Sequence, residues 1–142
     1  MGLLHNPVLL AALLAWFIAQ TLKVIFSVMQ TGKIDFRRFV GAGGMPSSHS
    51  ALAMGLTAKI GMTEGWGSTI FALSLVTSLV IMYDAANVRR AAGEQAEVLN
   101  KMIDELFHDG TIREERLKEL LGHTPLEVVA GAILGVAVAV IL

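Results

Sequence analysis

No cysteine occurs among the 142 residues of the chain. Its absence excludes disulfide bonds, thiolate metal sites and cysteine nucleophiles, and it leaves four histidines as the scarce reactive side chains. Charged residues are also few, at 16% of the sequence, and the formal net charge is -1. Because no basic field would attract a polyanion, we expect no nucleic-acid partner. The chain has neither internal repeats nor a linker, so we expect a single domain over residues 1–142.

Hydrophobic residues make up 54% of the sequence, and the mean hydropathy is +0.64. This is too apolar for a water-soluble domain of this size and indicates a membrane protein. Residues 7–29 would form a helix of about 34 Å, long enough to cross a hydrocarbon core of roughly 30 Å. Three further apolar runs, 47–62, 68–83 and 125–142, would give helices of about 24 to 27 Å, so some spans are predicted to be short or re-entrant.

A polar section over residues 84–122 separates the third apolar run from the fourth. Its apolar residues fall at helical spacing and predict an amphipathic helix that ends near Gly110: Val98, Leu99, Met102, Ile103 and Leu106. Thr111 and Glu114 have capping-box spacing and predict a second short helix, which Gly122 ends. We therefore expect an all-α fold, an integral membrane helical bundle of about four membrane helices with an amphipathic helical insertion before the last one.

Basic residues are distributed unevenly around the four runs. If all four runs cross the membrane, segments 30–46 and 84–124 lie on one face, and they hold nine of the eleven Lys and Arg residues. The positive-inside rule places that face in the cytoplasm, which predicts a multi-pass protein of the cell membrane with both termini outside. Basic residues retained for binding would produce the same asymmetry.

Two histidines lie at predicted helix starts on that face. In GGMPSSHSA, Pro46 is expected in the first helical turn, which places His49 in the opening turn of the second run. In GHTPLEV, Thr124 has the position of an N-cap and Glu127 follows three residues later, so His123 lies just before the last helix. Helix N-termini carry unpaired N–H groups and a partial positive charge, and both favour an anion such as phosphate.

These residue types suit phosphoryl transfer without a metal or another cofactor. One histidine can attack phosphorus while the other protonates the leaving oxygen, and a carboxylate can orient the first. Basic and hydroxyl side chains would bind the phosphate oxygens, and the candidates are Lys23, Arg38, Ser47, Ser48, Arg89 and Arg90.

A family resemblance appears at the same residues. Met-Pro-Ser-Ser-His at 45–49 resembles the Pro-Ser-Gly-His motif of the type 2 phosphatidic acid phosphatase and vanadium haloperoxidase superfamily, and His123-x-x-x-Glu127 resembles its His-x-x-x-Asp ending. With YDAANVRRAAGEQA and LKELLGHTPLEV, the likeness is closer to the divergent bacterial and plant branch and covers nearly the whole chain. The resemblance implies an all-helical membrane phosphatase with His123 as nucleophile, His49 as general acid and Glu127 as the partner of His123. Arg89 or Arg90 would supply the arginine of the third motif.

The chain departs from the superfamily pattern at several points. Ser48 replaces a glycine, Glu127 replaces an aspartate, and no Lys-x6-Arg-Pro motif is present. Five residues separate the arginine and the histidine of the third motif in the family, whereas 32 separate Arg90 from His123. Purely structural roles are the alternatives: helix capping for Ser47, Ser48 and Glu127, snorkelling for Lys23, and topology anchoring for Arg89 and Arg90.

The predicted function is a membrane phosphatase that hydrolyses a lipid phosphate or an isoprenoid diphosphate through a phosphohistidine intermediate. One alternative is a non-catalytic membrane protein that binds lipid phosphate headgroups, and another is a structural oligomeric module. The paired histidines discriminate between them, because a binding protein needs only basic residues. Short helices cannot easily shield a polar site from lipid, so we also expect a homodimer or larger homo-oligomer.

Overall fold

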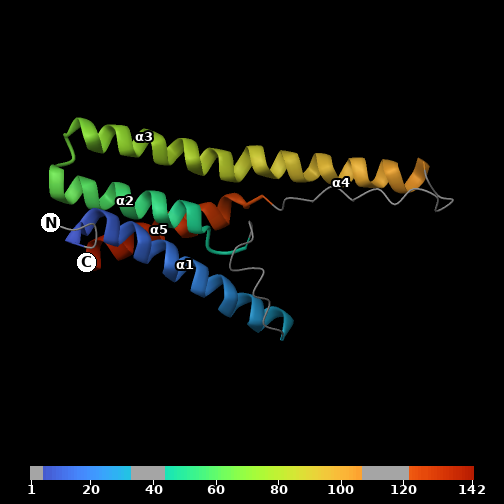
Figure 1. Cartoon of the computed structure of the whole chain (residues 1–142), viewed down its shortest axis with the longest axis horizontal. Coiled ribbons are helices and arrows are strands. Elements are labelled where there is room, and N and C mark those ends of the chain that lie inside the picture. The colour runs from blue at the N-terminus through green and yellow to red at the C-terminus, as the bar shows by residue number, and fades with distance from the viewer. Residues whose placement is uncertain (1–4, 33–43, 107–121) are drawn as a thin grey trace.

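The computed structural model describes residues 5–32, 44–106 and 122–142. Within these ranges the chain is helical and contains no strand (Figure 1). The elements are α1 (Pro7–Thr31), α2 (Ser48–Glu64), α3 (Thr69–Tyr83), the π-helix η3 (Asp84–Val88), α4 (Arg89–Leu106) and α5 (Pro125–Ile141). The four predicted apolar runs are thus confirmed as helices, each within two residues of the predicted bounds.

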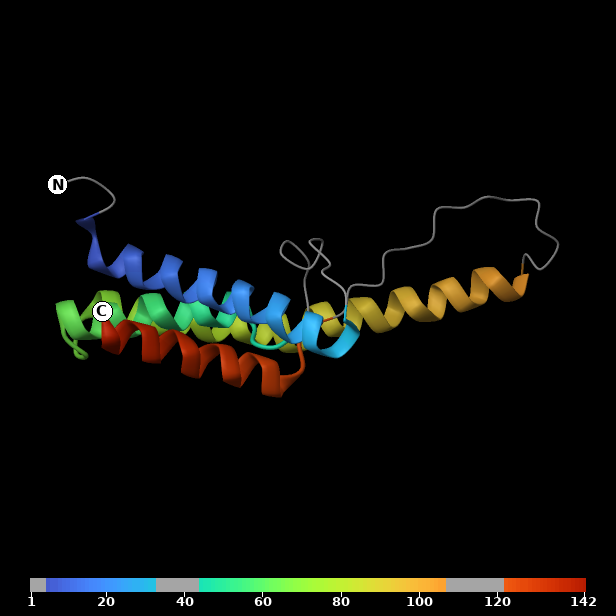
Figure 2. The same ribbon diagram turned by 90° about the horizontal axis from the view of Figure 1, so that it is seen from below.

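Four of the helices pack side by side into one bundle, with α2 in contact with α1, α3 and α5 (Figures 1 and 2). The first turn of α1, the last turn of α5 and the connection between α2 and α3 all lie at one end of the bundle. Consequently α2 and α5 run parallel, and both begin at the opposite end. The two histidines that were predicted at helix starts, His49 and His123, therefore lie at that opposite end.

Side-chain caps fix where the helices begin. Each of the four bundle helices begins with an N-cap residue in extended conformation: Asn6, Ser47, Ser68 and Thr124. Each of these side chains accepts a hydrogen bond from a backbone N–H of the following turn. Such caps satisfy donors that have no partner inside the helix. The prediction for Pro46 is wrong: because Ser47 is the cap, that proline precedes the helix instead of lying in its first turn.

The interior of the bundle is built from small residues, while large apolar residues face outward. Ala15, Ala19 and Ala51 are fully buried and pack together, whereas Phe17, Leu73 and Ile133 are each more than half exposed. An apolar exterior around a small-residue interior is the pattern of helices packed in lipid. By length and composition, α1 and the long helix that starts at Thr69 can cross a membrane, and α5 is a shorter apolar helix. The fold is therefore an all-α membrane helical bundle.

Hydroxyl groups join α2 to α3 in the middle of the bundle. Thr57 Oγ1 lies 2.7 Å from the Oγ atoms of both Ser74 and Ser78, and Ser78 Oγ donates to the carbonyl of Ala53 at 3.0 Å. Because Ser78 uses its only proton on that carbonyl, Thr57 must donate to Ser78, and Ser74 must then donate to Thr57. The three hydroxyl protons are all used within the protein.

The polar section that follows α3 continues the same helix. Through η3, α3 runs directly into α4, giving one rod of about 57 Å at 1.5 Å per residue, and α4 extends beyond the bundle (Figures 1 and 2). This confirms the amphipathic helix expected before the last span, although it begins at Arg89 without a break from the membrane helix. The predicted second short helix, from Thr111, lies outside the described residues.

Candidate active site

The start of α2 is held by Ser47 and by the backbone of α5. Ser47 Oγ accepts from the Ser50 backbone N–H at 3.4 Å and from Ser50 Oγ at 3.0 Å, and the Ser47 N–H donates to the carbonyl of Glu127 at 2.9 Å. The Ser47 side chain is fully buried. These contacts support the capping role for Ser47, and a role in binding phosphate stays a prediction.

Two glycines of α5 allow that close approach. A Cβ at Gly131 would collide with the Ser47 carbonyl oxygen, and one at Gly135 would collide with the Ala51 carbonyl oxygen. The two glycines form a Gly-x-x-x-Gly pair, which lets helix backbones touch. They bring the starts of α2 and α5 together and so position the residues that follow.

Gly131→Ala should therefore destabilise the protein, by about 2 kcal/mol, because the obstructing atoms are backbone and cannot rotate away. The thermal unfolding midpoint in mild detergent measures this. Gly67→Ala is the matched control, since a Cβ there meets nothing within 4 Å. Equal midpoints for the two variants would contradict the contact.

Lys23 points into the bundle toward the start of α2. Its Nζ donates to Ser48 Oγ at 3.3 Å, and the two residues are 4% and 2% exposed. The stem of Lys23 lies beside Gly44, which has a positive φ of 87°. A buried, hydrogen-bonded lysine is not a snorkelling anchor, so the structure argues against that alternative, and a role for Lys23 in binding phosphate stays a prediction.

His123, just before α5, is held by two contacts. Its backbone N–H donates to the carbonyl of Ala85 in η3 at 3.1 Å, and its Nδ1 lies 3.1 Å from Glu127 Oε2. The side chain of His123 is 2% exposed and that of Glu127 is 19% exposed. Since a carboxylate can only accept, the Nδ1 contact favours the tautomer with a proton on Nδ1, which leaves the lone pair on Nε2.

Glu127 makes its two predicted contacts, to His123 and to the helix cap, with the same oxygen. Its Oε2 accepts from the Thr124 N–H at 3.1 Å as well as facing His123, and its own N–H donates to Thr124 Oγ1 at 3.3 Å. The capping box is therefore complete. Because the box fixes the carboxylate, the imidazole that depends on it is fixed too.

His49 completes the group from the opening turn of α2. Its ring centroid lies 6.4 Å from that of His123, with an angle of 64° between the planes, and the side chain is exposed. Two imidazoles from distant parts of the chain are thus neighbours at two helix N-termini, one of them buried and held by a carboxylate. This arrangement can present a nucleophilic nitrogen and a proton donor to one phosphoryl group.

The predicted arginine ligands are less fully described. Arg89 and Arg90 open α4 directly after η3, which contacts the loop of His123 through Ala85, but their side chains lie outside the described residues. Arg38 also lies outside them. Within the described ranges, no three His, Asp or Glu residues are grouped closely enough to hold a metal ion.

Sequence reasoning did not identify η3 or the two glycines of α5 as parts of the site. The glycines carry a readable signal, since their four-residue spacing inside an apolar run is typical of close helix contacts. The role of Ala85 has no such signal, because its contribution is a backbone carbonyl.

Comparison with known proteins identifies relatives along the whole chain. A membrane protein of Bacillus subtilis, YuiD, whose name describes it as uncharacterized, is 38% identical over 153 aligned positions, which cover 100% of this chain and 97% of YuiD. No solved structure matches the chain. The sequence profile of the divergent PAP2 family matches residues 4–138. The chain therefore belongs to the divergent PAP2 family.

Proposed function

We propose that this protein is a metal-independent membrane phosphatase that acts on a lipid phosphate or an isoprenoid diphosphate. The observation that carries the proposal is the pairing of His123, which is buried and held through Nδ1 by Glu127, with the exposed imidazole of His49 at 6.4 Å. A site at helix ends of a membrane bundle suits a substrate whose phosphate lies at the interface. Membership of the divergent PAP2 family supports the same reaction class.

In the first step His123 Nε2 attacks phosphorus, the bond from phosphorus to the leaving oxygen breaks, and His49 gives its proton to that oxygen. The product is an alcohol, or a monophosphate when the substrate is a diphosphate, together with a phosphohistidine. In the second step His49 takes a proton from water, the water oxygen attacks phosphorus, and the N–P bond breaks to release inorganic phosphate. Glu127 stabilises the positive charge that develops on the His123 ring.

The cationic side chains and the N–H groups around the two imidazoles would bind the phosphate. The Lys23 ammonium, which lies against Ser48 Oγ, would carry positive charge to the phosphoryl oxygens, and the N-terminus of α2, with its partial positive charge, would favour the anion. Arg38, Arg89 and Arg90 are proposed as further ligands. The direct test is phosphate release by the purified protein in detergent containing EDTA, from a panel of lipid phosphates and isoprenoid diphosphates. Phosphate binding without release would leave the headgroup-binding alternative.

We propose a multi-pass topology with the active-site end in the cytoplasm. The basic residues gather on that side of the predicted spans, and the starts of α2 and α5 lie at the same end of the bundle (Figure 1). The substrate phosphate would then come from the inner leaflet.

Single cysteines test this topology, because the chain has none of its own. Glu97→Cys on α4 should resist a membrane-impermeant thiol reagent in intact cells and react after permeabilisation. Gly67→Cys, in the connection at the opposite end of the bundle, should react in intact cells. Labelling of the first variant and protection of the second would reverse the orientation.

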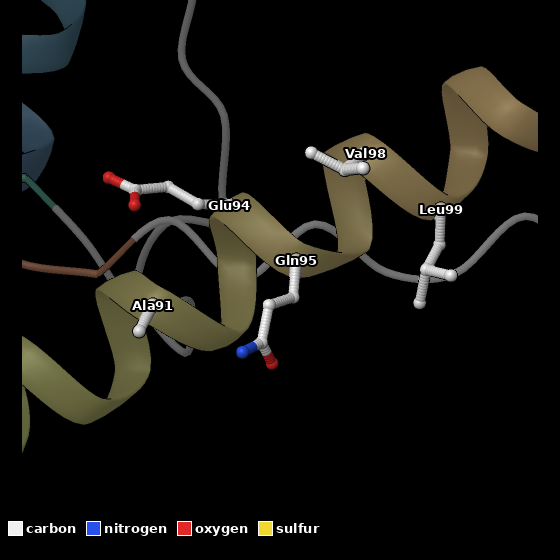
Figure 3. Close-up of a pocket in the computed structure, with 5 residues that line it drawn as sticks. All are labelled: Ala91, Glu94, Gln95, Val98 and Leu99. Carbon is white, nitrogen blue, oxygen red and sulfur yellow. The ribbon is translucent and has the colours of Figure 1, made fainter.

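We propose a homodimer whose contact includes α4. Val98 and Met102 are 57% and 51% exposed, and Ala91, Gln95, Val98 and Leu99 line a pocket on this helix together with Glu94 (Figure 3). The continuous helix from α3 to α4 is longer than a hydrocarbon core of roughly 30 Å. The apolar residues of α4 therefore lie outside the hydrocarbon core. Spacings of four, three and four residues, typical of a coiled-coil seam, separate residues 91, 95, 98 and 102. This pattern favours the α4 helix of a second copy of the chain as the partner of this surface.

Val98→Glu should therefore convert the dimer to a monomer in mild detergent, measured by light scattering coupled to size exclusion. Glu97→Gln, on the exposed polar side of α4, should leave the mass unchanged. An active monomer of the unmodified protein would contradict the dimer.

A further inference from the structure

A second recess lies in the membrane part of the bundle, and none of the residues that line it is a histidine. It is an apolar groove of about 230 Å³ between α2 and α3. Its wall on α2 is formed by Leu52, Ala53, Leu56 and Ile60, and its wall on α3 includes Leu73 and Thr77.

The groove contains hydroxyl side chains but offers no proton from them to a ligand. Ser74 and Ser78 use their protons in the network with Thr57 and Ala53 described above. Thr77 Oγ1 donates to the carbonyl of Leu73 at 2.9 Å, within its own helix. With these donors satisfied, the groove is suited to hydrocarbon and not to a polar group.

The α2 wall of the groove and His49 lie on the same face of α2. Leu52, Ala53, Leu56 and Ile60 follow His49 by three, four, seven and eleven residues, the spacing of one face of a helix. From His49 to Ile60 the helix rises about 16 Å, which is about half of a hydrocarbon core of roughly 30 Å. The groove therefore begins one turn below the proposed general acid and extends to the depth of one leaflet.

We propose that this groove binds a single hydrocarbon chain of the substrate and orients the phosphate that the chain carries toward His49 and His123. This rests on the proposed phosphatase function and adds where the chain of such a substrate is held: one alkyl or isoprenoid chain lies in the groove between α2 and α3. Leu56 and Thr77 determine how much of that chain fits, because they lie on opposite walls. Any second chain of a diacyl lipid stays in the bilayer.

Filling the groove provides the test. Thr77→Phe places a ring in it without breaking an α2–α3 hydrogen bond, since the Thr77 hydroxyl donates to Leu73 within α3. Val76→Phe is the matched control, because Val76 is 60% exposed and does not line the groove. Both variants are assayed against alkyl monophosphates of increasing chain length in one detergent.

The expected result is that kcat/KM of the unmodified protein rises with chain length. Thr77→Phe lowers kcat/KM for the long chains by about tenfold, the scale on which an apolar pocket discriminates size, and leaves the shortest chain within about twofold. Val76→Phe leaves the whole series unchanged. Three outcomes each overturn the groove as the chain site: an equal loss on short and long chains, no loss, or the same loss in Val76→Phe.

A readout without turnover separates this inference from the phosphatase proposal. A long-chain alkyl phosphate with a photoreactive diazirine at the far end of the chain should cross-link to groove residues such as Leu56 and Leu73. The alcohol analogue without phosphate, and the Thr77→Phe variant, should give much weaker labelling there. Groove labelling with no phosphate release from any substrate would overturn the phosphatase and support the chain site. Release with labelling spread over the outer surface would overturn the chain site alone.

Discussion

His123→Ala should abolish phosphate release, with a loss of at least about a thousandfold in kcat, because the covalent route needs the Nε2 lone pair and no other group replaces it. His49→Ala should behave differently. With an alkyl leaving group, which needs a proton, the loss should be about a hundredfold or more. With a nitrophenyl phosphate, whose leaving oxygen needs no proton, His123 should still become phosphorylated.

Trapping of the intermediate distinguishes the two histidines. Acid-labile phosphate should accumulate on the protein in His49→Ala with the nitrophenyl ester, and none should form in His123→Ala. His5, exposed before α1, provides a control in His5→Ala, which should keep full activity. Full turnover in purified His123→Ala would eliminate the mechanism, and trapped phosphate on His49 would reverse the assignment of roles.

Glu127→Gln should lower kcat by about 10² to 10⁴ and leave KM nearly unchanged. The amide has almost the shape of the carboxylate and can still accept from the Thr124 N–H, but it no longer carries the charge that favours the Nδ1–H tautomer and the imidazolium. The same loss should appear in the rate of phosphohistidine formation.

Thr124→Ala separates the catalytic role of Glu127 from its capping role. It removes the acceptor for the Glu127 N–H and leaves the carboxylate beside His123, so it should cost about 1 kcal/mol of stability with little change in kcat. A large loss of kcat in Thr124→Ala and a small one in Glu127→Gln would mean that the carboxylate serves only as a cap.

The local features of the site were readable from the sequence because they depend on neighbours along the chain. Thr124 and Glu127 make a capping box by their three-residue spacing, and the four residues from His123 to Glu127 bring those side chains together on one helical turn. The bounds of the apolar helices follow in the same way from composition and from capping residues such as Ser47 and Asn6. Pro46 was misplaced because the preference of proline for a first turn gave way to the cap that Ser47 makes.

The sequence by itself determined that this is an all-helical membrane protein, where its apolar helices lie, and which histidines stand at helix starts, since each of these depends on composition or on spacing of a few residues. Only the tertiary structure decided that His49 and His123 are neighbours, that Lys23 is buried against Ser48, and that α3 continues into α4. The physical reason is that these relations depend on how helix surfaces fit. The glycines of α5 admit the α2 backbone at close contact, and one carbonyl of η3 anchors the loop before α5.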